Sequence, residues 1–461
     1  MTGQLEVAPA TMSPPDREDT RRGGPGWRPL TRVAFRFCLV YTVLFFLTEM
    51  RIAYPLLGVF AADLPPAVLS WQYHAVGPIV DWVAANLVHA PAPLLEPVQS
   101  GDQAFFWVLT LTWSLVALLI TLVWSVLDRH RPGYPTAFGW WRVVVRMCLA
   151  AQLFSFGFAK VFPLQMSLPL TRLVEPFGDF SPMNVLWSQV GSSPLYEVLL
   201  GCAEVTAGLL LVIPRTALLG ALLAAVELTQ VLVLNIAYEV PLKIFTLHLL
   251  GLALLLVAPD AVRLARVLFS DRGVGPVTRP AAWLTARGAH VALVAQLLVG
   301  LWLAGSQVHR EWTLWNAIGV PGPKPPLYGI WDVTEFSMDG QVRPPLTTDT
   351  QRWRRLIVDT THSYQLQPVS SQRMDGSIVD HDAVFDPPNR TLTLADATDP
   401  AWSAQLVFDQ TTPDALKLDG TLDGHTVQIT LTKVDVGAFA VTGGGVRWVQ
   451  DAPLEPRKQP R

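Results

Sequence analysis

The apolar run GCAEVTAGLLLVIPRT at residues 201–216 contains a glutamate, Glu204, with no cation in the adjoining turns. Further ionisable or amide side chains recur in the neighbouring apolar stretches, namely Lys160, Glu197, Glu227, Gln230 and His248. Carboxylates, an ammonium and an imidazole in apolar surroundings can carry protons. The same groups can also hold helices together through hydrogen bonds. The first question is which of these two tasks they perform.

The spacing of these side chains places several of them on shared helix faces. Glu197 and Glu204 are seven residues apart, which corresponds to about two helical turns, and Glu227 and Gln230 are three apart. The two members of each pair therefore lie on one face. Polar groups arranged in this way can point at one another rather than at lipid.

We hypothesise a shared-proton cluster of Glu204, Glu227 and His248, with Lys160 and Glu197 above it toward the outer surface. Glu227 and His248 match Glu204 more closely in depth than Lys160 does, although a lysine stem could reach inward. Two carboxylates in a medium of low dielectric do not both ionise cheaply. We therefore expect at least one of them to hold its proton near neutral pH.

Each of these side chains also has a structural interpretation. A charge at the centre of a membrane costs at least ~2.5 kcal/mol, so Glu204 needs either a helix-pairing partner or a proton. His248 could bind a quinone carbonyl or a metal, or it could be an ordinary interhelical hydrogen-bond donor. Lys160 could pair with a carboxylate or extend to the outer interface.

The composition indicates the solvent in which these groups lie. Of the 461 residues, 51% are hydrophobic and 15% are charged, whereas a soluble chain carries about 25% charged residues. The net charge of −3 gives no reason to expect nucleic acid as a partner, and the three cysteines all lie in apolar stretches, which excludes a disulfide framework. A lipid bilayer is the expected partner.

Seven stretches approach the ~20 residues that cross a bilayer. They are 33–50, 103–127, 142–161, 195–213, 216–236, 242–258 and 288–305.

Arginines are distributed unevenly among the connections between these stretches. They gather at residues 17–32, 129–142 and 263–287, whereas the connection from Ile52 to the second stretch has no lysine or arginine. Cytoplasmic loops carry the excess of basic residues. We therefore predict a multi-pass protein of the bacterial cytoplasmic membrane, with its N-terminus inside and its C-terminal domain outside.

The last third of the chain has the pattern of an antiparallel sheet. Apolar and polar residues alternate in TVQITLTKVD and RTLTLAD. Turn signals recur at Asp339-Gly340, Asp375-Gly376, residues 386–390, Asp419-Gly420 and Asp423-Gly424. We predict eight to ten short strands that form a barrel or a sandwich, with the barrel favoured. The DHD segment at residues 380–382 is interpreted as solvated surface rather than a metal site, because adjacent strand residues face opposite sides.

The segment YGIWDVTEF, with Gly329 and Trp331, resembles the Gly-x-Trp opening strand of lipocalin-like barrels. In that setting Trp331 plugs the barrel floor, or alternatively contacts a ligand. A barrel of this size holds one small apolar ligand or is filled by its own side chains.

The placement of polar groups between residues 141 and 258 resembles the four-helix DoxX family. The stretch from Arg146 to GFAK, which ends in Gly157 and Lys160, is similar to the family's first helix. The resemblance covers about a quarter of the chain. It implies a four-helix core in a protein linked to membrane oxidoreductase assemblies, among them the small membrane subunit of a thiosulfate and quinone oxidoreductase.

The segment AEVTAGLLLVIPRTALLGALL is similar to the Glu-x-x-x-Gly second helix of that family, which is followed by an arginine at the cytoplasmic turn. Glu204, Gly208 and Arg215 occupy those places. Arg146 and Arg215 are then the basic residues on the cytoplasmic side. The resemblance makes a quinone the candidate cofactor and a redox protein the candidate partner.

The predicted organisation is a disordered cytoplasmic tail (1–30), a helical transmembrane domain (31–305), a linker (306–324) and an extracytoplasmic β domain (325–455). Two functions fit it. The protein is a quinone-linked or proton-handling subunit of a membrane redox assembly. Alternatively, it is a noncatalytic membrane scaffold or lipophile carrier whose β domain binds a ligand or a partner protein.

Overall fold

The computed structural model describes residues 27–61, 64–270, 286–360, 369–396, 399, 401–443, 448–449 and 451. Within these residues, seven helical segments are long and apolar enough to cross a membrane, which confirms the predicted number. They are α1 (Pro29–Thr48), α4 (Ala104–Leu127), α5 (Pro135–Val161), α7 (Pro194–Val212), α8 (Ala217–Ala237), α9 (Lys243–Val257) with its continuation α10 (Ala261–Phe269), and α11 (Ala286–Ile318). The chain is a multi-pass membrane protein by this criterion.

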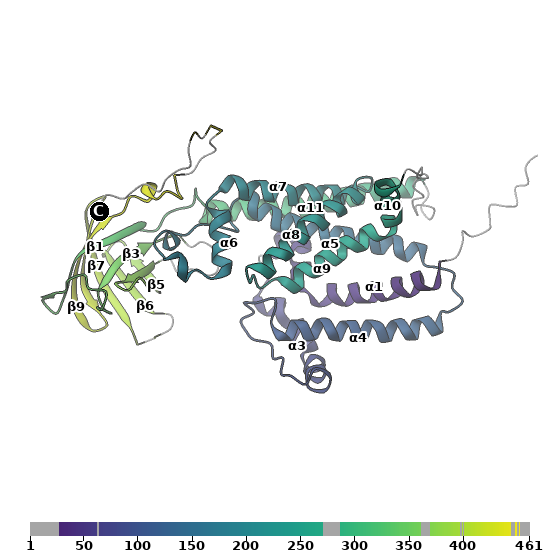
Figure 1. Cartoon of the computed structure of the whole chain (residues 1–461), viewed down its shortest axis with the longest axis horizontal. Coiled ribbons are helices and arrows are strands. Elements are labelled where there is room, and N and C mark those ends of the chain that lie inside the picture. Colours follow the sequence, from purple (N-terminus) through teal and green to yellow (C-terminus); the bar gives the residue numbers. More distant parts are fainter. Residues whose placement is uncertain are drawn as a thin grey trace, which may run out of the picture.

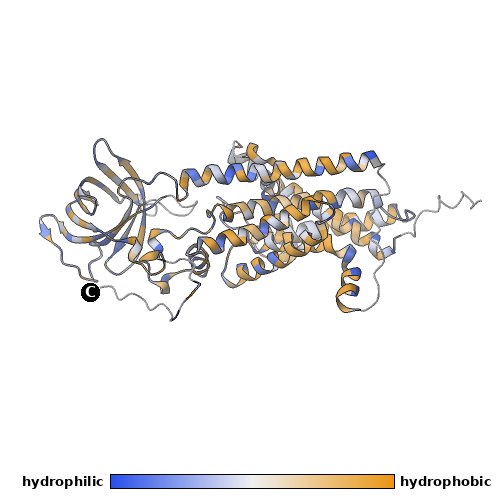
Figure 2. Ribbon diagram, turned by 90° about the horizontal axis from the view of Figure 1, so that it is seen from above, coloured by the Kyte–Doolittle hydropathy of each residue, from blue (hydrophilic) through white to orange (hydrophobic). Residues whose placement is uncertain are grey.

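Shorter helices lie between these segments. They are α2 (Met50–Leu57), η2 (Gly58–Ala61), α3 (Pro66–Val83), η3 (Ala84–Val88), η4 (Leu170–Leu173), η5 (Phe177–Asp179), α6 (Pro182–Gly191) and η6 (Ala258–Asp260). Figure 1 shows α3 and α6 at the end of the bundle that faces the β domain, which we call the barrel end, whereas α10 lies at the opposite end. The helices are largely apolar and the β domain is mixed in hydropathy (Figure 2).

Two predicted boundaries differ from the structure. The predicted tail lies outside the described residues up to residue 26, and α1 already begins at Pro29. The linker predicted from residue 306 is wrong as far as Ile318, because α11 continues to that residue. Its polar side chains misled the prediction: Gln307 and Glu311 are buried against the rest of the protein, and Arg310 pairs with Glu311.

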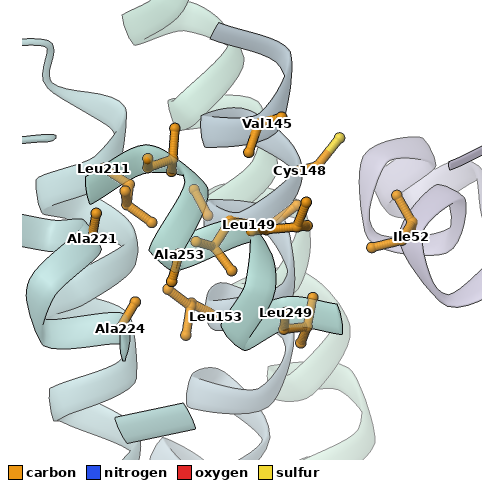
Figure 3. Close-up of a cluster of buried hydrophobic side chains, with 14 of the residues drawn as sticks. Ile52, Val145, Cys148, Leu149, Leu153, Leu211, Ala221, Ala224, Leu249 and Ala253 are labelled. Carbon is orange, nitrogen blue, oxygen red and sulfur yellow. The ribbon is translucent and has the colours of Figure 1, made fainter. Parts of the chain in front are cut away.

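Helix α5 is the centre of the helical domain. It packs against α7, α9, α2 and α11. Its fully buried Val145, Leu149 and Leu153 recur every four residues, so they form one continuous stripe. Figure 3 shows this stripe among apolar side chains of the neighbouring helices, including Leu211 of α7 and Ala253 of α9.

The C-terminal domain is a closed antiparallel barrel. Its strands are β1 (Gly329–Met338), β2 (Gln341–Val342), β3 (Trp353–Val358), β4 (Val369–Arg373), β5 (Ile378–Asp386), β6 (Thr391–Asp396), β7 (Ser403–Thr412), β8 (Ala415–Leu422) and β9 (His425–Lys433). Each strand pairs with the next along the order β2-β1-β3-β4-β5-β6-β7-β8-β9, and β1 also pairs with β9. This last pairing closes the sheet, so the predicted barrel is confirmed.

The turn signals were right at four hairpins and wrong at one site. Asp375-Gly376 lies in the turn between β4 and β5, and residues 387–390 form the turn between β5 and β6. Asp339-Gly340 and Asp423-Gly424 adopt positive φ at both residues and form the β1–β2 and β8–β9 turns. Asp419-Gly420 instead lies inside β8. A Cβ on Gly420 would lie 2.1 Å from the carbonyl oxygen of Gln405, so glycine serves here for the close approach of β7.

An apolar patch on the outer face of the barrel packs against the loop between α5 and α6. Ile330 of β1 and Ile357 of β3 point away from the barrel interior and contact Leu170 of that loop, and all three are buried. The amide of Leu170 donates to the Asp359 carboxylate at 2.7 Å. The barrel is therefore docked on the helical domain by apolar burial and by directed hydrogen bonds.

Trp331 lies in the barrel interior, which is filled with apolar side chains. It is fully buried, and its indole N–H donates to the carbonyl oxygen of Leu327 at 2.8 Å. Gly329, two residues earlier, has a φ of 141°, and a Cβ there would lie 2.8 Å from the Lys433 side chain. The Gly-x-Trp segment thus begins β1, and its Trp331 is the largest fully buried side chain among the described residues.

Trp331→Ala should lower the free energy of unfolding of the barrel by ~3 to 5 kcal/mol, because the substitution leaves a cavity in a filled core. The measurement is urea unfolding of residues 325–455 expressed alone, a length sufficient to bury a core. Trp448→Ala is the control, since Trp448 is 94% exposed. Equal effects of the two substitutions would contradict the assignment of Trp331 to the core.

Candidate functional site

Helices α5 and α7 cross at two glycines. A Cβ on Gly201 would lie 2.5 Å from the carbonyl oxygen of Gly157 and 2.8 Å from the Cβ of Lys160. A Cβ on Gly157 would lie 3.0 Å from the carbonyl oxygen of Gly201. These neighbours are largely backbone atoms, so a larger residue at either place would force the helices apart. The two backbones therefore approach each other most closely just before Lys160 and Glu204.

Lys160 and Glu204 form a buried ion pair at this crossing. The ammonium Nζ donates to both carboxylate oxygens, at 2.9 and 2.8 Å, and it also lies 3.3 Å from the carbonyl oxygen of Phe156. The two side chains are only 7% and 10% exposed. Glu204 thus has its cation on the neighbouring helix, although its own sequence neighbourhood offers none.

Glu227 of α8 is the second carboxylate of this group. It interacts electrostatically with both Glu204 and Lys160. Neither of its carboxylate oxygens is exposed or has a hydrogen-bond partner among the described residues. The site, which we call the α5–α7–α8 cluster, therefore contains one ammonium and two carboxylates: Lys160, Glu204 and Glu227.

Glu197 lies in the first turn of α7 and has a different task. It is 1% exposed and accepts a hydrogen bond from the amide of Met166 at 3.0 Å. It therefore fixes the loop that follows α5. Gln230, which sequence spacing placed beside Glu227, is exposed on the surface of α8. Gln230 therefore lies on the part of α8 that faces the surroundings rather than the cluster.

His248 is separated from the cluster, contrary to the shared-proton hypothesis. Its Nε2 lies 2.7 Å from the Tyr41 hydroxyl and its Nδ1 lies 2.7 Å from the carbonyl oxygen of Ile244. Its ring stacks on Phe45 with 4.3 Å between centroids. Depth along the helix misled the prediction, because this face of α9 meets α1 rather than α7. The contacts match the interhelical role that was the alternative for His248.

The two arginines assigned to the cytoplasmic side differ in their surroundings. Arg146 of α5 is 8% exposed and donates to the carbonyl oxygen of Val212, the last residue of α7, at 3.1 Å. It also donates to the side-chain oxygen of Gln296 of α11 at 2.6 Å. It thus ties three helices together at a helix C-terminus, where a cation is favoured. Arg215 is exposed in the turn between α7 and α8.

Sequence reasoning missed a polar network at the barrel end of α1. Arg51 donates to both carboxylate oxygens of Glu49, at 2.7 and 3.1 Å, and Tyr73 lies 3.4 Å from the same carboxylate. A cavity of about 20 Å³ between Glu49, Arg51 and His248 has room for about one water. The close sequence spacing of Glu49 and Arg51 after an apolar run was the available signal.

Asp102 joins the same end of the bundle to α9. Its carboxylate accepts from the backbone amides of Lys243 and Ile244, each at 2.9 Å, and lies 3.4 Å from the Lys243 ammonium. A carboxylate at a helix N-terminus meets unpaired amides and the positive end of the helix dipole. Asp102 and Lys243 therefore have structural partners.

The interpretation of the DHD segment as solvated surface is wrong for its histidine. His381 is 1% exposed and points into the barrel, where its Nε2 lies 2.8 Å from the Ser371 hydroxyl and its ring stacks on Trp402. Strand alternation, which argued against a metal site, also turns this one side chain inward. No group of three or more metal-ligating side chains occurs among the described residues.

Comparisons with known proteins give limited information. No family model matches the chain, and no solved structure matches it. An alignment over 124 residues covers 25% of this chain and 73% of "Uncharacterized protein YwoB" of Bacillus subtilis (strain 168), and the identity within it is 27%. That name gives no activity.

Lys160→Met should lower the thermal midpoint of the detergent-solubilised protein strongly, because removal of one partner of a buried pair costs ~3 to 5 kcal/mol. The double variant Lys160→Met, Glu204→Gln should recover part of that loss, since residue 204 then no longer carries a charge that has lost its partner. Lys417→Met, on the exposed surface of β8, is the control. If the double variant is less stable than Lys160→Met, the two residues do not act as a pair.

Burial lowers the pKa of His381 from 6.5 to about 4. The folded barrel then binds fewer protons than the unfolded chain between these two values, so its stability is complete above pH 6.5 and falls as the pH drops toward 4. The loss attributable to His381 is about 3 kcal/mol. Urea unfolding of residues 325–455 should show a weaker pH dependence in His381→Gln. The exposed His425, changed to glutamine, is the control, and an unchanged slope in His381→Gln would refute the assignment.

Proposed function

We propose that the protein is a proton-handling subunit of a quinone-linked redox assembly in the bacterial cytoplasmic membrane. The observation that carries the proposal is the buried carboxylate of Glu227, which has no hydrogen-bond partner in the described part of the chain. Lys160 is already bonded to Glu204, so the cluster holds one carboxylate more than its cation can neutralise. A proton on Glu227, taken up and released, balances this excess.

A quinone fits this site as a ligand, because reduction to a quinol consumes protons as well as electrons and creates hydroxyl groups. Such a hydroxyl would supply the donor that the Glu227 carboxylate lacks. Within this proposal Lys160 holds the Glu204 carboxylate in place through two hydrogen bonds, and Glu227 holds or passes the proton. The DoxX-like pattern of the four helices α5, α7, α8 and α9 supports the same class of assembly.

The alternative function, a noncatalytic membrane scaffold or lipophile carrier, also has a specific observation in its favour. The ion pair follows directly on the closest approach of α5 and α7, between Gly157 and Gly201. A pair in that place locks two helices in register whether or not a proton moves. The two functions make different predictions for Glu227, which lies beside the crossing and takes no part in it.

Glu227→Gln should therefore leave the thermal midpoint close to that of the parent but abolish redox-linked protonation, since it keeps the shape and removes titration. The measurement is the infrared difference spectrum of the purified protein upon reduction of co-purified quinone, with Glu335→Gln of the exposed barrel surface as the control. The parent and the control should show a carboxyl band that Glu227→Gln lacks. Purified parent that carries no quinone, or a band that persists in Glu227→Gln, would favour the scaffold.

The proposed orientation places the N-terminus in the cytoplasm and the barrel outside. The basic residues gather at one end of the bundle, where Arg32 donates to the carbonyl oxygens of Arg129 and Arg131. Alkaline phosphatase fused after the barrel should be active in cells. Fluorescence from a plain GFP fusion at the same place would mean that the barrel lies in the cytoplasm and would contradict the proposed orientation.

A further inference from the structure

A second cavity lies outside the α5–α7–α8 cluster. It has a volume of about 300 Å³ and lies between α3, the loop that precedes α4 and the first turn of α4. Ligand pockets span roughly 300 to 1,000 Å³, so this one suits a small group rather than a whole lipid. It lies along α3, which Figure 1 shows at the barrel end of the bundle.

The cavity follows one side of α3. Tyr73, Gly77 and Asp81 recur every four residues, and all three line it. A Cβ on Gly77 would have no heavy atom within 4 Å. The lack of a side chain at this position therefore leaves the middle of the cavity open.

The charged groups around the cavity are mainly acidic. Asp81 is exposed and has no ion-pair partner among the described residues, and Glu96 lies 3.1 Å from His74, which also lines the cavity. No lysine or arginine occurs between Ile52 and Leu127, so this segment supplies no cation of its own. The site therefore favours a cationic ligand.

The other walls indicate which kind of cation fits. Tyr73 and Phe105 are buried aromatic residues that pack edge to face, with 6.3 Å between their centroids. Aromatic rings attract organic cations, whereas a metal ion needs several converging oxygen or nitrogen ligands. Such a metal-binding group is not found in the described residues. An ammonium group on a short carbon chain matches both the charge and the walls.

The surroundings of the cavity match the depth of lipid headgroups. Trp71 and Trp82 of α3 are 61% and 59% exposed. Tryptophans of this kind occupy the membrane–water interface. The cavity also touches Phe105, in the first turn of the membrane-spanning helix α4. A ligand in the cavity would therefore lie where α4 enters the interface.

We propose that the cavity beside Gly77 and Asp81 binds an alkylammonium group, which is present both in the headgroup of phosphatidylethanolamine and in free amines. Asp81 pairs with the ammonium. His74, which lines the same cavity, would donate to a neighbouring phosphate oxygen through the ring nitrogen that does not face Glu96. The proposal is independent of proton transfer at the α5–α7–α8 cluster.

The test is native mass spectrometry of the full-length protein titrated with dihexanoylphosphatidylethanolamine, dihexanoylphosphatidylglycerol or free ethanolamine. The ethanolamine lipid should bind more tightly than the glycerol lipid. If free ethanolamine binds as tightly as the lipid, the source is a soluble amine, and if it binds weakly, the source is the membrane. Equal binding of the two lipids would overturn the proposal. So would a failure of both the ethanolamine lipid and free ethanolamine to bind.

Two variants locate the binding. Asp81→Asn removes the charge and should weaken binding about tenfold or more, as expected for a charge-assisted hydrogen bond. Gly77→Trp fills the cavity and should abolish binding without displacing the backbone. Asp382→Asn, an exposed carboxylate of the barrel, is the matched control and should bind as the parent does. Parent-like affinity in both Asp81→Asn and Gly77→Trp would refute the site, and thermal midpoints verify that the variants are folded.

Discussion

The contact between Gly157 and Gly201 is the constraint on which the helical domain depends. Neither position has room for a Cβ, so the backbones of α5 and α7 come close enough for a lysine on one helix to reach a glutamate on the other. The resulting pair of Lys160 and Glu204 is almost fully buried. In lipid, a buried charge without a partner is expensive, so the crossing and the ion pair require each other. Because Lys160 is bonded to Glu204, Glu227 is the carboxylate of the cluster that has no cation of its own.

The same helix also connects the membrane domain to the barrel. Glu197, two turns before Glu204 on α7, holds the amide of Met166 in the loop that follows α5. Four residues later, the amide of Leu170 is held by Asp359 at the end of β3. The loop is thus bonded to α7 at one point and to the barrel at another.

Composition and periodicity were sufficient to predict the number of membrane-crossing helices and the closed barrel, because both signals are repeated along the sequence. Helix ends were predicted less well: polar residues such as Gln307 and Glu311 resembled a linker, yet they are buried by tertiary contacts. Sequence also cannot give the rotation of one helix against another. This is why His248 was grouped with Glu204 from its depth, although its face of α9 meets Tyr41.

The most direct test of the account is a distance measurement between the lysine ammonium and the glutamate carboxyl carbon in lipid bilayers. Solid-state NMR of the full-length protein, labelled with ¹⁵N at lysine Nζ and ¹³C at glutamate Cδ, detects such contacts. Lys160 is the lysine that pairs with a glutamate among the described residues. The account predicts one short contact that is lost in Glu204→Gln and kept in Glu227→Gln. Absence of the contact in the parent, or its loss in Glu227→Gln alone, would contradict the account.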